Sequence, residues 1–230
     1  MAKAGRLHVT RLLLVALVLA LALAACGGGG DEPEATTEAA ATTSAASGPC
    51  ESVDAPEPKA GGGETAPTLP LDTAKTWDLV VETNCGSFTI RLDLETAPKT
   101  AASLVSLAQN GFFDGTTFHR VVPGFVIQGG DPTGTGTGGP GYQTVDVPPP
   151  GSAYTEGVVA MAKAGFEAPG TSGSQFFVVT VADTGLPAEY AVVGKVTEGM
   201  ETVKAIDALG VGDGPPSQPV VIEQVTVVSE

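Results

Sequence analysis

The chain has 230 residues and carries 11 Lys or Arg against 26 Asp or Glu, a formal net charge of −15 at pH 7. A surface this acidic repels nucleic acid and anionic lipid headgroups, so the composition argues against a nucleic-acid partner. With three cysteines and two histidines, the chain also lacks the clustered side chains that a zinc site or a nucleophile–base pair requires. We therefore expect neither a metal nor a cofactor.

Residues 1–25 have the pattern of an export signal. Three basic residues precede an apolar run, Leu12–Ala22, which is shorter than the about 20 residues that span a bilayer as a helix. The sequence Leu-Ala-Ala-Cys that ends at Cys26 resembles a bacterial lipobox, in which this cysteine is lipidated and becomes the first mature residue. An ordinary secretory signal with an incidental cysteine is the alternative. The lipobox predicts an extracytoplasmic protein held on the cell membrane by acyl chains.

The segment 26–75 is rich in Ala, Thr, Ser, Glu, Pro and Gly and has no aromatic residue. Such a composition cannot bury enough apolar surface to offset its ordering entropy, so it predicts a disordered tether. The remaining residues, 76–230, suit one compact domain. Cys50 and Cys85 are an even pair in an exported protein and could form a disulfide, with two free thiols as the alternative.

Two β-rich runs, 79–84 and 87–92, open the domain and are separated by Cys85 and Gly86, which predicts a hairpin. A helix of about three turns follows. Thr96 is its candidate hydroxyl cap, and apolar residues recur at helical spacing until Gly111.

Short strand-like runs come next, bounded by glycine, proline or polar turns, at 118–122, 125–129, 157–161, 175–180 and 191–196. A second helix near 200–209 ends at Gly210. The closing strand, 220–227, changes the phase of its alternation around Glu223 and Gln224. Seven or eight short strands with two separated helices predict an antiparallel barrel whose ends the helices cover.

Two motifs carry the functional information. The segment Phe118–Asp131 places one arginine among apolar residues beside a Gly-rich loop, and Met161–Gly165 is followed by Gly173–Phe177. Together and in this order, they resemble the active-site segments of the cyclophilin family of peptidyl-prolyl cis-trans isomerases, over roughly residues 77–228. The resemblance implies a mainly β fold, a closed eight-stranded antiparallel β-barrel capped by two α-helices.

The resemblance also implies the residues of the site. Its catalytic residues would be Arg120, Phe125 and Gln128. Its substrate-binding residues would be Val126, Ala162, Lys163, Gln175, Phe177, Leu186 and Tyr190. The implied enzyme is a monomer that accelerates X-Pro bond rotation in proline-containing polypeptides, and with the lipobox at Cys26 we expect it to act on exported proteins at the membrane surface. A non-catalytic peptide-binding or chaperone-like module that uses the same groove is the alternative.

This reaction suits a chain with few catalytic groups, because it needs rotation about a partial double bond and no nucleophile. The barrier is about 20 kcal/mol. In the twisted amide the nitrogen lone pair can accept a hydrogen bond, and a guanidinium is an always-charged, rigid donor for it. By the resemblance, Arg120 has that role, whereas His119 points to the opposite face of a regular strand and is interpreted as structural.

The sequence departs from the family pattern in three places. Lys163 stands where many eukaryotic members carry asparagine, and the loop 166–172 is longer than in the compact eukaryotic members. The segment Thr184–Tyr190 has no tryptophan where cyclosporin-sensitive members carry one, and a tyrosine where they carry histidine. We therefore expect weak cyclosporin binding. The Gly-rich loop 133–139 lacks the Lys-Ser/Thr of a phosphate-binding loop, so we expect no nucleotide site.

Overall fold

The computed structural model describes residues 50–230, so the signal sequence, Cys26 and the start of the tether lie outside the described residues. The strands are β1 (Trp77–Thr83), β2 (Gly86–Leu92), β3 (Thr116–Thr117), β4 (Arg120–Val122), β5 (Val126–Gly129), β6 (Thr144–Val145), β7 (Val158–Met161), β8 (Thr171–Ser172), β9 (Phe176–Val179), β10 (Val192–Glu198) and β11 (Val221–Ser229). The helices are α1 (Pro98–Gln109) and α2 (Met200–Asp207). Within residues 50–230, no helix is long and apolar enough to cross a membrane.

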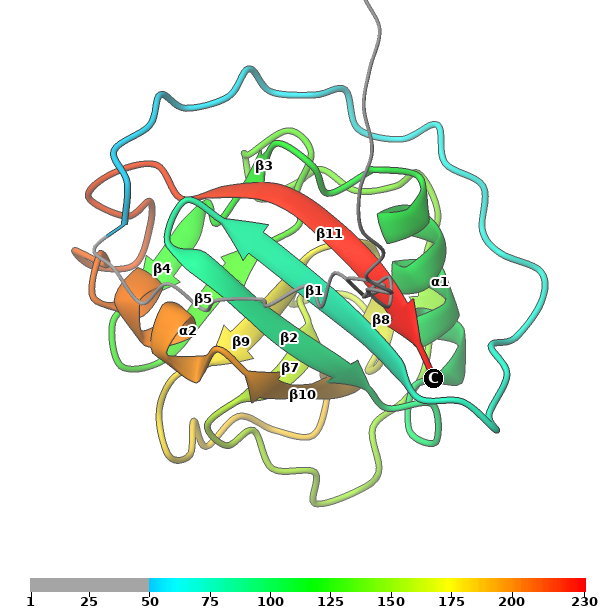
Figure 1. Cartoon of the computed structure of the whole chain (residues 1–230). Helices are drawn as coiled ribbons and strands as arrows, with labels where there is room; N and C mark the ends of the chain where they lie inside the picture. The colour runs from blue at the N-terminus through cyan, green and yellow to red at the C-terminus, as the bar shows by residue number, and fades with distance from the viewer. Residues whose placement is uncertain (1–49) are drawn as a thin grey trace, which may run out of the picture. The chain divides into compact units, whose positions relative to one another are not determined.

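Nine of the strands form one antiparallel sheet, in the order β3-β11-β1-β2-β10-β7-β9-β5-β4, while β6 pairs only with β8. The sheet curls strongly, so that β1, β2 and β11 lie across from β5, β7 and β9 (Figure 1). Its ladder nevertheless has two ends, β3 and β4, which the chain joins through Phe118 and His119 without pairing one strand with the other. The ladder is thus a strongly curled nine-stranded half-barrel, in which an isolated bridge between Thr117 and Asp131 brings β3 to the end of β5, and the predicted closure into eight strands stays a prediction.

The predicted hairpin is confirmed as β1 and β2, whose register places Val81 opposite Phe88. The predicted irregularity in the last strand is a β-bulge. Glu82 pairs with Gln224 and the next residue of β1 pairs with Ile222, so Glu223 is the extra residue. A bulge changes the phase of side-chain alternation along a strand, and this is the change that the sequence shows around Glu223 and Gln224.

The two helices lie on opposite sides of the curled sheet (Figure 1). The prediction that Thr96 caps α1 is wrong, because its hydroxyl donates to the Val192 carbonyl at 3.1 Å. Asp146, from the segment after β6, accepts instead from the Thr100 amide at 2.7 Å and from the Thr100 hydroxyl at 2.7 Å. A carboxylate from a distant loop therefore stabilises the positive end of the helix.

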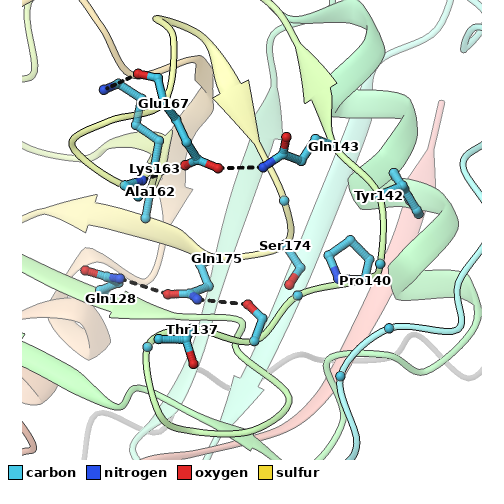
Figure 2. Close-up of a pocket in the computed structure, with 18 of the residues that line it drawn as sticks. Gln128, Thr137, Pro140, Tyr142, Gln143, Ala162, Lys163, Glu167, Ser174 and Gln175 are labelled. Atoms are coloured by element: carbon cyan, nitrogen blue, oxygen red, sulfur yellow. Dashed lines mark hydrogen bonds between the residues drawn. The ribbon is translucent and has the colours of Figure 1, made fainter.

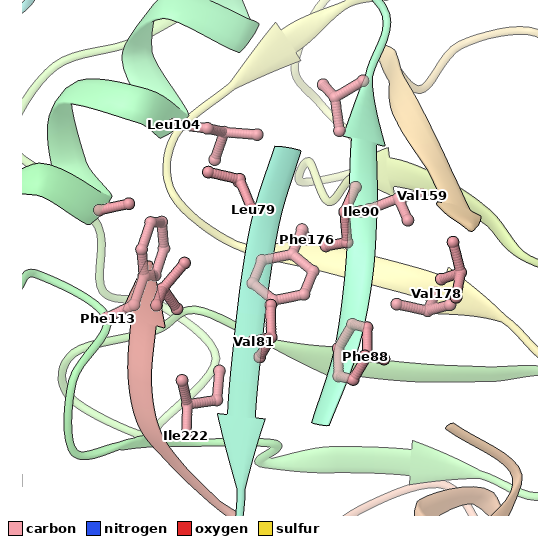
Figure 3. Packing of buried hydrophobic residues seen from close by; sticks show 14 of the residues in the cluster. Leu79, Val81, Phe88, Ile90, Leu104, Phe113, Val159, Phe176, Val178 and Ile222 are labelled. Atoms are coloured by element: carbon pink, nitrogen blue, oxygen red, sulfur yellow. The ribbon is translucent and has the colours of Figure 1, made fainter. Parts of the chain in front are cut away.

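Two apolar clusters pack on this sheet. The larger one fills its concave side, where Phe88, Phe113, Phe118 and Phe176 contact each other edge to face or at a tilt (Figure 3). A smaller cluster centred on Phe177 packs on the other side. Neighbouring residues on a strand point to opposite faces, so Phe176 and Phe177 belong to different clusters.

Residues 50–75 contain no helix or strand, yet they do not form the detached tether that composition predicted. The amide of Glu51 donates to the Asn84 carbonyl at 2.8 Å and the amide of Lys59 to the Pro132 carbonyl at 2.8 Å. The segment passes around the outside of the domain (Figure 1). The segment is ordered by these backbone hydrogen bonds, by the Cys50–Cys85 disulfide and by contacts of the Lys59 and Glu64 side chains.

Candidate active site

The predicted catalytic residues lie in one row across the sheet. Arg120 on β4 is directly opposite Gln128 on β5, and Gln128 is opposite Phe177 on β9. Directly opposed residues on paired strands point their side chains to the same face. The fold therefore brings together a cation and an amide from the first motif with an aromatic ring from the second.

Apolar residues surround Phe177 on this face. The buried members of the cluster are Val126, Tyr154, Ala160, Phe177 and Val179, and the half-buried residues packed against them include Phe125, Ala162, Leu186 and Tyr190. The rings of Phe177 and Tyr190 meet edge to face with their centroids 5.6 Å apart. All the predicted apolar site residues thus share one partly exposed surface, next to Arg120 and Gln128.

The guanidinium of Arg120 is held by two partners. Its Nε and Nη2 donate to the two Asp213 carboxylate oxygens at 2.5 and 3.1 Å, and its Nη1 donates to Gln128 Oε1 at 3.1 Å. The hydrogen bond from Arg120 is the main cause that lowers the pKa of Asp213 below its ordinary value. Of the five guanidinium N–H groups, these contacts leave one on each terminal nitrogen to donate to a substrate.

The amides beside Arg120 form a short chain of hydrogen bonds. Gln128 Nε2 donates to Gln175 Oε1 at 3.0 Å, and Gln175 Nε2 donates to the Gly138 carbonyl at 2.9 Å (Figure 2). Both glutamines are therefore held in place by the protein before any peptide binds. The chain links the arginine to the Gly-rich loop 133–139.

Asp131 holds that Gly-rich loop together. Its carboxylate is 1% exposed and accepts hydrogen bonds from the amides of Thr133, Gly136 and Gly138 and from the Thr133 hydroxyl. Burial acts to raise the pKa of Asp131, but these hydrogen bonds outweigh it and lower the pKa. A Cβ on Gly138 would lie 2.0 Å from Asp131 Oδ1, so only glycine fits there. The loop amides thus serve an internal carboxylate instead of a phosphate.

A pocket of about 870 Å³ adjoins the apolar surface (Figure 2). It is called the polar pocket because it holds the amide and charged side chains of the site, although Pro140, Tyr142 and Phe166 also line it. It is lined by four of the predicted site residues, which are Gln128, Ala162, Lys163 and Gln175. Ala162 belongs to both the pocket and the apolar cluster. The site therefore has two lobes, one apolar and one polar, with the Arg120 row beside them.

The side chain of Lys163 is tied to the protein. It is only 2% exposed, its Nζ lies 3.1 Å from Glu189 Oε2 and 5.4 Å above the Tyr190 ring, and it donates to the Glu167 carbonyl at 3.2 Å. These contacts fasten the long loop after β7 to the segment that carries Tyr190. Lys163 thus shapes the rim between the two lobes through its contacts with the protein.

Sequence reasoning missed two residues of the site. Tyr154 is fully buried, and its hydroxyl donates to the Tyr190 carbonyl at 2.8 Å and accepts from the Tyr190 amide at 2.9 Å. Burial is the main cause that raises its pKa. Asp213, the partner of Arg120, lies 93 residues further along the chain. Neither residue stands in a local pattern that could have marked it.

The remaining predicted residues lie away from the row. Both ring nitrogens of His119 are buried without a hydrogen-bond partner among residues 50–230, and burial is the main cause that lowers its pKa. Cys50 and Cys85 are joined by a disulfide. Within the described residues, no group of three His, Cys, Asp or Glu side chains could hold a metal ion.

Comparisons with known proteins agree with this geometry. The sequence model of the family described as cyclophilin type peptidyl-prolyl cis-trans isomerase/CLD matches residues 79–227. The chain is 41% identical over 177 residues to peptidyl-prolyl cis-trans isomerase A of Mycobacterium tuberculosis, covering 69% of this chain and 94% of that protein. It is 39% identical over 160 residues to peptidyl-prolyl cis-trans isomerase-like 1 of Gibberella zeae, covering 67% and 97%.

Solved structures give the same result. The crystal structure of a cyclophilin type peptidyl-prolyl cis-trans isomerase from Cryptosporidium parvum is similar with a TM-score of 0.62 and 31% identity, over 67% of this chain and 99% of that one. A structure of that protein in the presence of the dipeptide Ala-Pro is similar with a TM-score of 0.61 and 32% identity, over 66% and 99%. The chain therefore belongs to the cyclophilin-type peptidyl-prolyl cis-trans isomerase family and is an isomerase of that type.

Proposed function

We propose that this isomerase turns X-Pro bonds at the row of residues that begins with Arg120, with the proline ring seated on the apolar lobe. The observation that carries this assignment is the guanidinium held by Asp213 and Gln128 beside a partly exposed apolar surface. Proline needs apolar surroundings, and the twisted amide nitrogen needs a fixed donor. The Ala-Pro dipeptide in the similar Cryptosporidium structure supports a proline-containing ligand.

Such a site can supply the transition-state stabilisation that the reaction requires. A rate increase of about five powers of ten corresponds to roughly 7 kcal/mol of selective transition-state stabilisation. Preorganised donors in a site that excludes water supply several kcal/mol each. Arg120 would donate to the amide nitrogen only when that nitrogen has lost its conjugation, so the interaction favours the twisted state over both planar isomers.

The glutamines and Ala162 would orient the peptide backbone. The amide of Ala162 donates to the Gln175 carbonyl at 2.9 Å, so the Ala162 carbonyl is the group that would pair with an extended peptide. Gln128 and Gln175 would bond peptide groups from positions that the protein has already fixed. Preorganisation of this kind reduces the entropy that binding would otherwise cost.

A protease-coupled isomerisation assay with a proline-containing tetrapeptide tests the assignment. The wild-type full chain is expected to accelerate cis-to-trans conversion, and Arg120→Lys to lose about two powers of ten in kcat/KM, because an ammonium is a mobile point charge and not a planar fork. Activity of Arg120→Lys equal to wild type would refute the role given to this residue.

We also propose that the enzyme works outside the cytoplasm, as a monomer held on the membrane by lipid on Cys26. The support is the sequence alone, a basic and apolar leader that ends in Leu-Ala-Ala-Cys. Two or more acyl chains anchor a protein stably at about 0.8 kcal/mol per buried methylene. The clients would then be exported polypeptides that refold near the membrane.

Fractionation of cells that express the full chain tests the anchor. Wild type should sediment with membranes, and Cys26→Ser should either enter the soluble fraction or remain unprocessed. Ala25→Gly keeps a small residue before the cysteine and serves as the control. A native mature protein whose N-terminus is any residue other than a lipid-modified Cys26 would overturn the proposal.

A further inference from the structure

Residues 50–64, called the strap below, lie outside the segment that the family model matches, yet several contacts hold them to the domain. The Cys50–Cys85 disulfide fixes one end. Lys59 Nζ donates to the Phe112 and Asp114 carbonyls, the first at 3.3 Å. Near the other end, Asn110 Nδ2 donates to Glu64 Oε2 at 3.2 Å.

The strap forms part of the wall of the polar pocket. Gly61 and Gly62 line the pocket together with residues 136–143. The Gly62 amide donates to the Gly139 carbonyl at 2.8 Å, and the Glu64 amide donates to the Pro140 carbonyl at 3.0 Å. The backbones approach so closely that a Cβ on Gly141 would lie 3.0 Å from Gly62 Cα.

The same contacts connect the strap to the Arg120 row. Gly139, which accepts from the strap, follows Gly138, whose carbonyl accepts from Gln175. Gln175 is bonded to Gln128, and Gln128 to Arg120. The strap therefore borders the loop that contacts Gln175, while the Asp131 carboxylate holds that loop through the amides of Gly136 and Gly138 independently of the strap.

The charged groups of the pocket are already satisfied by the protein. Glu167 accepts from Gln143 Nε2 at 2.5 Å and from the Ala164 amide at 2.6 Å, while Lys163 is paired with Glu189. An acidic peptide side chain would lose its hydration there beside the Glu167 carboxylate, which neutral amides contact, and would find Lys163 already paired with Glu189. Neutral groups that exchange hydrogen bonds with the glycine backbone and the glutamine side chains, and that pack on Tyr142 and Phe166, suit the remaining lining.

We propose that the strap is a specificity-determining wall of the enzyme, which favours a neutral polar side chain, such as Gln or Ser, over an acidic one at a position flanking the proline. A volume of about 870 Å³ is large enough for more than one such residue. The inference rests on the proposed placement of the proline on the neighbouring apolar lobe.

The first test compares substrates on the full chain with and without a fixed strap. The triple substitution Cys50→Ser/Cys85→Ser/Lys59→Met, called the anchor variant, removes the disulfide and the contacts of the Lys59 side chain without touching the pocket lining. Lys75→Met is the control for the lost charge. The substrates are a blocked Ala-Pro peptide and longer peptides with Gln, Glu or Leu at the flanking positions. Wild type and Lys75→Met should prefer the Gln peptide over the Glu peptide at least about fivefold in kcat/KM.

In the anchor variant this preference should fall to about twofold or less, while turnover of the short peptide stays within twofold of wild type. An unchanged preference in the anchor variant would overturn the proposal, and so would a wild type that does not distinguish Gln from Glu. Failure of the wild type to turn over even the short peptide would instead refute the proposed function.

Amide hydrogen exchange on the unmodified protein gives an independent answer if the triple variant folds poorly. Saturating Gln peptide should slow exchange at residues 59–64 relative to the blocked Ala-Pro peptide. Equal exchange of this segment with both peptides would contradict a strap that contacts the substrate.

Discussion

Asp213 should matter for turnover and not for folding. Asp213→Asn keeps the size of the side chain but removes the charge that orients the Arg120 guanidinium, and a misplacement of about 1 Å can cost up to 100-fold in rate. We predict about a tenfold fall in kcat with KM and the unfolding midpoint unchanged, because an exposed ion pair contributes little to stability. Asp183→Asn, on an exposed loop, is the matched control. Wild-type kcat in Asp213→Asn would remove this residue from the catalytic arrangement.

The same pair determines the pH profile. Arg120 lowers the folded-state pKa of Asp213, so their interaction is complete above the ordinary aspartate pKa of about 3.9 and is lost only as pH falls through the lowered value. We therefore predict a kcat that is flat from about pH 5 to 8. A bell-shaped profile in this range would indicate a proton-transfer step that the proposed mechanism does not contain.

His119 should reduce stability in mild acid. Burial lowers its folded-state pKa below 6.5, so the unfolded chain takes up the proton first as pH falls, and stability decreases below about pH 6.5. NMR titration should show the His119 ring still neutral at pH 6.5, and urea midpoints should be lower at pH 5.5 than at pH 7.5. A ring pKa at or above 6.5 would contradict this account.

The sequence predicted those site residues that stand in a local motif. Arg120, Gln128 and Phe177 could be predicted because they occur in two compact segments. Asp213 and Tyr154 could not, since each acts through one contact with a residue that is distant in the sequence, 93 positions away for Asp213 and 36 for Tyr154.

At the scale of elements, the disulfide should be the main attachment of the strap. The loop that it closes spans 35 residues, and the chain-entropy model gives about 3 to 4 kcal/mol for a loop of that length. We predict that Cys50→Ser/Cys85→Ser lowers the free energy of unfolding in urea by about that amount. Reducing agent should then destabilise wild type and leave the double variant unchanged. Two alkylatable thiols in the unreduced native protein would contradict the bridge.

The loop Thr184–Tyr190 should weaken cyclosporin binding. Gly185 and Leu186 occupy the region where sensitive relatives supply an indole ring and its N–H group, so a hydrogen bond and a large contact surface are lost. We predict an affinity at least about thirtyfold weaker than that of a tryptophan-bearing relative. Leu186→Trp should recover part of the difference, whereas low-nanomolar affinity in the wild type would show the prediction to be wrong.

Both helices and the longer strands could be predicted because hydrophobic periodicity needs several residues to be visible. The strands β3, β6 and β8 have two residues each, too few for any alternation. The path of residues 50–75 could not be predicted from composition, which reports on the burial of apolar side chains. Apart from the disulfide, which the cysteines indicated, this segment is held by backbone hydrogen bonds and by the Lys59 side chain.

The two faces of the curled sheet have different roles, one in the stability of the fold and the other in the proposed function. Its concave face buries the larger core, and its other face carries the smaller apolar cluster with the Arg120 row. Sequence patterns predicted an antiparallel barrel with two helices but not the nine-strand order of its ladder, because β3 has only two residues and leaves no alternation in the sequence. We interpret the strong net negative charge of the chain as serving solubility, because no step of the proposed mechanism uses it.

In the proposed mechanism, Arg120 acts on the twisted amide while the apolar lobe binds the proline. The decisive measurement is NMR exchange spectroscopy on one X-Pro peptide, which yields both the isomerisation rate on the enzyme and the Kd, for wild type, Arg120→Ala and Phe125→Ala. We predict that Arg120→Ala loses about two to three powers of ten in rate with Kd changed less than about fivefold. Phe125→Ala, which removes half-buried pocket wall, should weaken binding and rate together. Near-wild-type isomerisation by Arg120→Ala would contradict the claim.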